Sequence, residues 1–188
     1  MVTELSRAGM LVLWRRNALV EPSADSCSVE LFDGLRVDEL LEERMRAWYL
    51  AMLDRGDPAV VTDAAELFSV DDTTSGVWRR IKVDSAVRRV LSLRLAGWEQ
   101  AVTVVRDDRA AELVAASANP YLRPTAATPA AVIMADGALY ASPVTEPVIV
   151  SATATVDTGP ELYRLDESAL ATIPTIFTNE LLTQNPFR

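Results

Sequence analysis

The sequence has no histidine, a single cysteine (Cys27) and a single lysine (Lys82) among its 188 residues. Without histidine, the chain cannot build a Ser-His or Cys-His nucleophile pair, a histidine general base or a histidine metal ligand. A lone cysteine excludes an internal disulfide and a cysteine-based zinc cage. Because these absences remove the commonest catalytic arrangements, we look first for a structural role.

Phosphate-binding loops and membrane segments are also missing from the sequence. The seven glycines are scattered, and they form neither a G-x-G-x-x-G motif nor a Walker-type loop. The apolar piece from Met10 to Trp14 is followed directly by Arg15 and Arg16, so it is too short to span a membrane. We therefore expect no cofactor, no metal and no membrane partner.

The balance of charge is acidic, with a formal net charge of -9. Wrapping nucleic acid through phosphate contacts requires a basic surface, which argues against that function. An acidic chain is compatible with lining a passage through which DNA slides, because like charges do not stick. The hydrophobic content of 49% supports a buried core, and the length predicts one domain over residues 1–188, with a small second lobe as the alternative.

Apolar periodicity predicts several helices. The clearest covers residues 38–54, where Gly56 and Pro58 end a stripe that consists of Leu41, Met45, Trp48 and Met52. Shorter helices are expected over 61–68 and 107–118, the latter capped by Asp107 or Asp108. A terminal helix is expected over 166–184, with Asp166 as its cap.

Short apolar or alternating runs predict strands over residues 11–14, 29–32, 77–83, 87–96, 102–105 and 148–156. Asp71-Asp72 is expected to form an acidic turn. Asp136-Gly137 predicts a hairpin between residues 131–134 and 138–141. Because these elements lack a βαβ rhythm, the expected class is α+β, a small helical bundle with antiparallel strands. Three prolines also predict an extended arm over 119–141, and we expect flexible termini over 1–20 and 183–188.

Two tight carboxylate pairs, Asp71-Asp72 and Asp107-Asp108, are the candidates for catalysis. Metal-assisted hydrolysis uses hard oxygen ligands, so a carboxylate-dependent hydrolase is one alternative. The plainer interpretation is a solvated turn and a helix start, and we expect no enzyme activity. Four tryptophans near arginines would suit base stacking, but the acidic chain favours packing.

The segment from Arg89 to Pro147 carries a resemblance to a known group of proteins. It contains the strand and turn LRLAGWEQAVT (93–103), the loop NPYLRPT (119–125), a strand after Pro129 and the return strand LYAS (139–142). In this order of elements, residues 80–185 resemble virion proteins of crAss-like phages and related tailed phages of Bacteroidetes. Ala101 stands where a proline is expected, and Pro174 interrupts the last helix.

The resemblance implies a head-to-tail connector, a ring or adaptor in the virion neck between portal and tail. Such proteins form closed rings, commonly twelve-fold, so the expected partners are further copies of the chain and the portal and tail proteins. Genomic DNA passes through the lumen without sequence-specific contact, and assembly takes place in the host cytoplasm. No catalytic residue is implied. A tail-completion, tube or minor capsid protein is the alternative within the virion.

A small set of residues is predicted to serve assembly. Trp98 is expected to be a packing anchor. The loop residues Asn119, Pro120, Tyr121 and Arg123 are expected to form a rigid extended connection. Asp136 and Gly137 form the tip of a hairpin that we expect to touch a neighbouring subunit, because a ring interface must reach from one subunit to the next.

Overall fold

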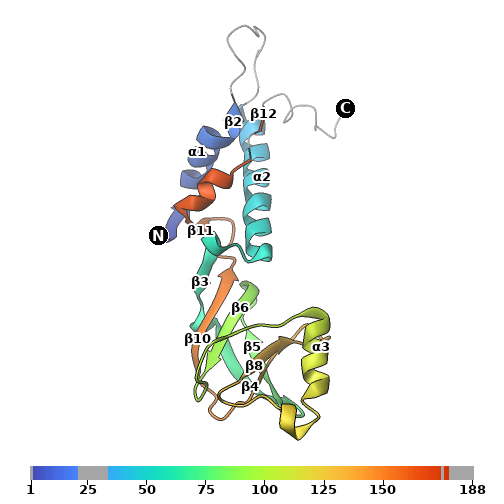
Figure 1. Ribbon diagram of the computed structural model, residues 1–188. Helices are drawn as coiled ribbons and strands as arrows, with labels where there is room; N and C mark the ends of the chain where they lie inside the picture. Colours follow the sequence, from blue (N-terminus) through green and yellow to red (C-terminus); the bar gives the residue numbers. More distant parts are fainter. Residues whose placement is uncertain (1, 21–33, 175, 178–188) are drawn as a thin grey trace. The chain divides into compact units, whose positions relative to one another are not determined.

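The protein is described by a computed structural model, which describes residues 2–20, 34–174 and 176–177 (Figure 1). Contacts within the chain divide it into two compact units, unit 1 (1–60 and 158–188) and unit 2 (61–157), where the length alone predicted one domain. Helices and antiparallel sheets are both present, which confirms the α+β class. None of the helices in the described ranges is long and apolar enough to cross a membrane.

Unit 1 combines helices with two small pairs of strands. Its elements are β1 (Val2–Ser6), α1 (Arg7–Ala18), β2 (Leu19–Val20), α2 (Gly34–Arg55), η1 (Pro58–Val60), β11 (Leu162–Asp166), η4 (Glu167–Thr172) and β12 (Ile176–Phe177). β1 pairs with β11 in antiparallel fashion, and β2 pairs with β12 in parallel fashion. The two ends of the described chain are therefore joined within this unit.

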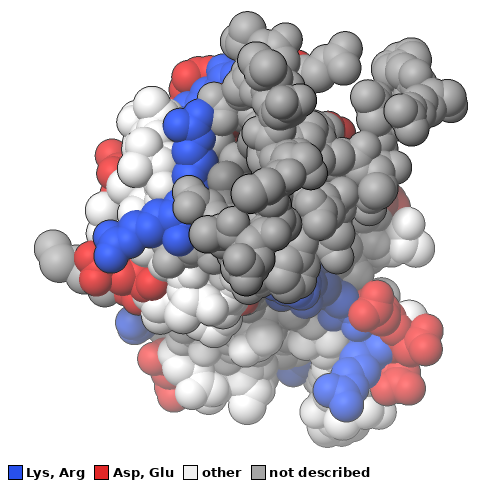
Figure 2. Space-filling model, turned by 90° about the horizontal axis from the view of Figure 1, so that it is seen from above, with Lys and Arg blue, Asp and Glu red and all other residues white. Residues whose placement is uncertain are grey.

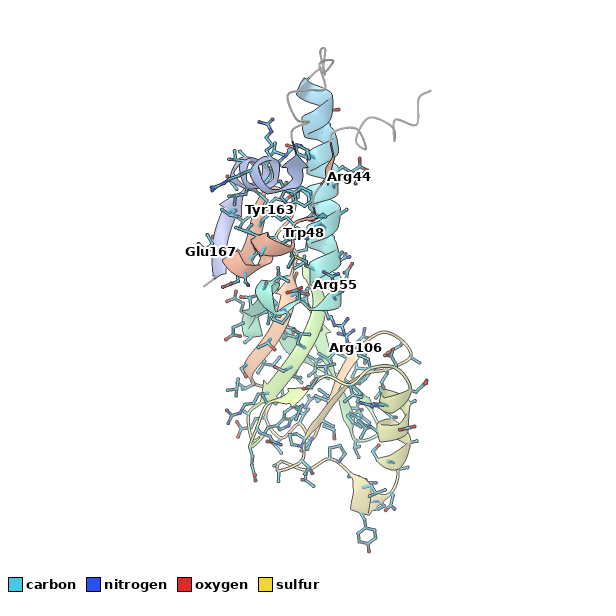
Figure 3. All side chains as sticks on the ribbon, turned by 45° about the horizontal axis from the view of Figure 1, so that its top comes forward. Arg44, Trp48, Arg55, Arg106, Tyr163 and Glu167 are labelled. Atoms are coloured by element: carbon cyan, nitrogen blue, oxygen red, sulfur yellow. The ribbon has the colours of Figure 1, made fainter. Side chains whose placement is uncertain are left out.

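Helix α2 supplies the main apolar surface of unit 1. Leu41, Met45 and Met52 of the predicted stripe are buried, whereas Trp48 is half-buried and its neighbour Tyr49 is buried. α1 packs against this stripe with Met10 and Trp14, which are four residues apart and fully buried. Two edge-to-face aromatic pairs complete the core. The ring centroids of Trp14 and Trp48 lie 5.7 Å apart, and those of Tyr49 and Tyr163 lie 5.0 Å apart. Figure 3 shows Trp48 and Tyr163 within this cluster.

Local hydrogen bonds explain where α1 begins and where α2 ends. At the start of α1, the Ser6 hydroxyl oxygen accepts from the Gly9 backbone N–H at 3.2 Å. α2 ends at Arg55, and the next residue, Gly56, has a φ of 71°. Gly56 N–H donates to Leu53 O, and the following N–H, of Asp57, donates to Met52 O. This is a Schellman motif, and it confirms the predicted helix end.

Several predictions for unit 1 are wrong. Residues 11–14, expected as a strand, lie in α1, and residues 2–18, expected to be flexible, form β1 and α1. The terminal helix over 166–184 is replaced by β11, η4 and β12 in the described part. Asp166 still acts as a cap, because its carboxylate accepts from the Ser168 N–H at 3.0 Å. The predicted strand 29–32 and the tail 183–188 lie outside the described residues.

Unit 2 contains two four-stranded sheets with the orders β3-β10-β6-β7 and β4-β5-β9-β8. The strands are β3 (Val61–Asp63), β4 (Phe68–Ser75), β5 (Trp78–Val83), β6 (Val87–Leu95), β7 (Val102–Thr103), β8 (Ala130–Ile133), β9 (Leu139–Ser142) and β10 (Ile149–Val156). A parallel bridge between Val105 and Val132 links the β7 end of one sheet to the β8 end of the other. The unit also holds η2 (Ala65–Leu67), α3 (Asp107–Ala116) and η3 (Pro120–Leu122).

The core of unit 2 lies between its sheets, and a second layer lies under α3. Alternating residues of both sheets form one buried cluster, including Leu93, Leu95, Ala152, Ile81 and Leu139. The opposite face of the β4-β5-β9-β8 sheet forms another cluster with α3, made of Trp78, Ala110, Val132 and Tyr140. Because this sheet is covered on both faces, all four residues of β9 are buried.

The strands predicted over 77–83, 87–96 and 148–156, the helix over 107–118 and the hairpin around Asp136-Gly137 are confirmed. The predicted 61–68 helix is wrong: its residues form β3 and η2. Asp71-Asp72 lies within β4, at a shift in pairing register between Val70 and Thr74. Neither Asp107 nor Asp108 caps α3; Arg106 occupies the cap position without a side-chain bond. The extended arm predicted over 119–141 is wrong, because residues 120–122 form η3 and because β8 and β9 pair inside the sheet next to β5.

Candidate assembly surface

Trp98 is a packing residue of its own unit. It is 3% exposed and belongs to the cluster between the two sheets of unit 2. Its indole N–H donates to the Pro143 carbonyl at 2.6 Å, and its backbone N–H donates to Leu95 O at 3.1 Å. The tight turn that places it contains Gly97, whose φ of 83° suits glycine. The predicted anchor therefore acts inside the unit.

Residues 119–123, which we call the Tyr121 turn, present a large aromatic side chain to solvent. Tyr121 is 94% exposed and Leu122 is 61% exposed. The Asn119 side-chain oxygen accepts from the Tyr121 N–H at 3.0 Å, and the Asn119 backbone carbonyl accepts from the Leu122 N–H at 3.0 Å. Pro120 fixes φ, and Arg123 Nε donates to Ser117 O at 3.3 Å. Hydrogen bonds on both sides of Tyr121 thus fix the backbone that carries the exposed ring.

The hairpin tip satisfies its own polar groups. The Asp136 carboxylate accepts from the Ala138 N–H at 3.0 Å and from the Tyr140 hydroxyl at 3.1 Å. The Ala138 N–H, and then the Tyr140 hydroxyl, lower the pKa of Asp136 against the opposing effect of burial. Burial, together with the Asp136 hydrogen bond, raises the pKa of Tyr140. Gly137 adopts a φ of 76°, so this tip is a self-contained turn.

An open pocket of about 710 Å³ lies where β6, the segment after β7 and the start of α3 meet. We call it the arginine pocket, and its lining residues are Arg89, Val90, Leu91, Thr103, Val104, Val105, Arg106, Asp107, Asp108 and Arg109. Its wall is therefore a mixture of aliphatic side chains and guanidinium groups, with two carboxylates at the first turn of α3. Figure 3 labels Arg106, which directly precedes α3.

Arg106 is the fixed point of this pocket. One of its terminal nitrogens donates to Val90 O at 2.9 Å, which ties the start of α3 to β6. Burial lowers the pKa of Arg106, and the nearby Arg89 lowers it further, against an opposing effect of Asp107. The next residue, Asp107, has a φ of 61°, a conformation that aspartate tolerates better than most residues. The pocket thus brings cationic groups together in a partly desolvated environment.

The two carboxylate pairs lie in different elements of unit 2. Asp71 lies 3.4 Å from Lys82 Nζ, and Asp72 lies 2.5 Å from Arg79, so β4 pairs its acids with β5. Asp107 and Asp108 instead begin α3. Across the part of the chain that the structure describes, no group of three His, Cys, Asp or Glu side chains could hold a metal ion.

Charged side chains of both signs are interspersed on the face shown in Figure 2. Ion pairs in unit 1 include Arg164 with Glu4 at 2.7 Å and Arg7 with Glu42. Because opposite charges alternate at this scale, contacts to this face depend on local pairing more than on a field of one sign.

Sequence reasoning located part of this surface. Asp136 and Gly137 lie at the tip of the β8-β9 hairpin, as predicted. Asn119, Pro120, Tyr121 and Arg123 fall in one turn around η3 where an extended connection was predicted, and Trp98 lies in the core of unit 2. The arginine pocket was missed, because Arg89 and Arg106 are brought together only by the pairing of strands. No family model matches the chain, and a search of curated proteins finds no significant match.

Proposed function

We propose that this protein is a structural subunit of a tailed-phage virion, a head-to-tail connector that forms a ring between portal and tail. The observation that carries the proposal is the Tyr121 turn, which presents a 94% exposed tyrosine on a hydrogen-bonded backbone. Tyrosine is enriched at the energetic centres of protein interfaces, and a preorganised loop loses little freedom on binding. The same residues belong to the segment that resembles phage connector proteins.

The mode of contact follows from the edges of the sheets. β4 stands at one end of its sheet, and strand addition to a neighbour would use such an edge. It carries Asp71 and Asp72 at an interruption in its pairing register. Charges and irregularities of this kind discourage edge-to-edge pairing. We therefore favour insertion of side chains as the contact between subunits.

The acidic balance suits the proposed place in the virion. With a net charge of -9, the subunit does not attract the phosphate backbone, and genomic DNA can pass a ring of such subunits without adhering. The proposed partners are therefore other copies of the chain, the portal and the tail, with DNA in the lumen without sequence-specific contact.

Light scattering and electron microscopy of the purified full chain test this proposal. We expect a closed ring, twelve-fold by the resemblance, or ring formation on addition of the portal protein. A chain that stays monomeric at all concentrations and binds neither portal nor tail would contradict it. Density for the chain in the tail tube or capsid of intact particles would instead favour the alternative virion roles.

A further inference from the structure

The arginine pocket lies wholly within unit 2, and hydrogen bonds to β6 fix its wall. The Val104 N–H donates to Leu91 O at 2.9 Å, and Arg106 donates to Val90 O, also at 2.9 Å. Leu91 and Val105 line the pocket and are half-buried, so they offer aliphatic surface. Because these contacts are made inside one unit, a ligand meets a site that is already formed.

The guanidinium groups of the pocket outnumber its carboxylates. The charged residues that line it are Arg89, Arg106, Arg109, Asp107 and Asp108. Both aspartates and Arg109 are exposed, whereas Arg89 and Arg106 are half-buried. The less exposed part of the pocket is therefore cationic.

Within the described ranges, no carboxylate forms an ion pair with Arg106 or Arg109. Burial and then the nearby Arg89 lower the pKa of Arg106, against the smaller opposing effect of Asp107. A partly desolvated cation beside a like charge is unfavourable, and a bound anion would offset this. A guanidinium has five N–H donors, and the one printed bond of Arg106 goes to Val90 O, so donors remain for such a ligand.

We propose that the arginine pocket binds a small organic anion. Arg89 and Arg106 bind its phosphate or carboxylate oxygens, because the planar fork of a guanidinium matches both kinds of oxyanion. The apolar part of the ligand lies against Leu91 and Val105. The volume of about 710 Å³ is in the range of small-molecule sites. This site goes beyond the proposed connector role, which uses the Tyr121 turn.

Titration of the full chain with small aromatic probes tests the class of ligand. Phenyl phosphate and benzoate carry the two kinds of oxyanion on the same ring, benzyl alcohol is the neutral control and benzylamine is the cationic control. NMR of the arginine Nε–H groups measures binding at the pocket. We expect saturable shifts of the Arg106 signal with at least one anion, and the anion with the lower Kd identifies the headgroup. No saturable shift with either anion, or equal affinity for the alcohol or the amine, would overturn the proposal.

Removing a guanidinium should weaken binding of the anion that binds more tightly. Arg106→Gln should raise its Kd about 10-fold or more, because hydrogen bonds to charged groups are strong. Arg109→Gln should raise the Kd about threefold, since Arg109 is exposed. Arg88→Gln is the matched control, because Arg88 is exposed on β6 and does not line the pocket. Equal losses in all three variants would indicate general electrostatic attraction and overturn the site.

Removing a carboxylate should have the opposite effect. Asp107→Asn and Asp108→Asn should each lower the Kd about threefold, because the carboxylate no longer repels the anion. Asparagine tolerates the φ of 61° at Asp107 as aspartate does, so the backbone is preserved. Misfolding cannot produce tighter binding, so this test does not depend on Arg106→Gln staying folded. Weaker binding by both aspartate variants, folded by circular dichroism, would contradict the proposal.

The anion site and the connector role can fail independently. A chain that binds the anion, stays monomeric and binds neither portal nor tail overturns the connector role and leaves the site intact. A ring without affinity for either anion overturns the site and leaves the connector role intact.

Discussion

The hydrogen bond between Trp78 and Ser117 offers a sharp test of how α3 is attached to its sheet. Trp78 is 1% exposed, and its indole N–H donates to the Ser117 hydroxyl at 3.0 Å. That hydroxyl donates in turn to Val114 O at 2.6 Å within the last turn of α3. Ser117→Ala removes the acceptor and leaves the indole N–H buried without a partner.

The expected cost follows from this orphaned donor. A buried polar group that loses its partner destabilises a protein by about 1–3 kcal/mol, more than the net value of the bond itself. Trp78→Phe removes the donor, so its cost comes mainly from the lost ring volume. Ser117→Ala should therefore cost less in the Trp78→Phe background. The coupling between the two substitutions should be about 1 kcal/mol.

Urea unfolding of the four proteins measures this coupling. With an m-value of about 2 kcal/mol/M, Ser117→Ala should lower the midpoint by roughly 0.5–1.5 M. Ser85→Ala, in the exposed turn between β5 and β6, is the matched control and should leave the free energy of unfolding within about 0.5 kcal/mol. The reasoning is refuted if Ser117→Ala is as mild as this control, or if it costs the same in both backgrounds.

Two further predictions concern turns of unit 2. At Gly97, φ is 83° and an added Cβ would lie 2.6 Å from Thr145 Oγ1, whereas Gly76 has a φ of 62° and open space. Gly76→Ala should cost only the left-handed strain of about 1–2 kcal/mol. Gly97→Ala should lower the melting temperature further, and a Thr145→Ala background should remove this additional decrease. Equal decreases in melting temperature for the two glycine variants would contradict the clash. For Asp136, the folded pKa is depressed, so its stabilisation is complete above the unfolded pKa of about 3.9 and is lost as pH falls through the folded pKa. Carboxyl NMR should give a titration midpoint for Asp136 below 3.8, and the midpoint should move closer to 3.8 in Tyr140→Phe. Asp136→Asn should make the free energy of unfolding depend less on pH under acidic conditions. A midpoint at or above 3.8 would count against the hydrogen bonds.

The two long helices of unit 1 show where periodicity suffices and where it fails. α2 offers three full repeats of its apolar stripe and a glycine at its end, so its identity was predictable. α1 has one short apolar run, which suits a strand and a helix equally well. Only Ser6, whose hydroxyl accepts from the Gly9 N–H, marked a helix start. Packing of Met10 and Trp14 against α2 decides in favour of the helix.

Predictions failed elsewhere where pairing between distant segments decides the structure. Asp71 and Asp72 are common turn residues, yet they lie in β4 because Phe68 and Val70 pair with β5 and because Lys82 and Arg79 neutralise them. For the candidate site, the exposed loop was visible in its prolines and its asparagine. The arginine pocket was not, since its lining comes from residues 89–91 and 103–109.

The order of the two units along the chain has a consequence for synthesis. Unit 2 is one continuous stretch, residues 61–157. In unit 1, β1 pairs with β11, and the whole of unit 2 lies between these two strands in the sequence. Unit 2 can therefore form its sheets once residue 157 has left the ribosome, while β1 waits for residues 162–166. Domains that fold during synthesis generally do so from the N-terminus onward. Here β1 is made before unit 2 but finds its partner only after unit 2 is complete, so a chain cut short before β11 would carry a finished unit 2 on an unfinished unit 1.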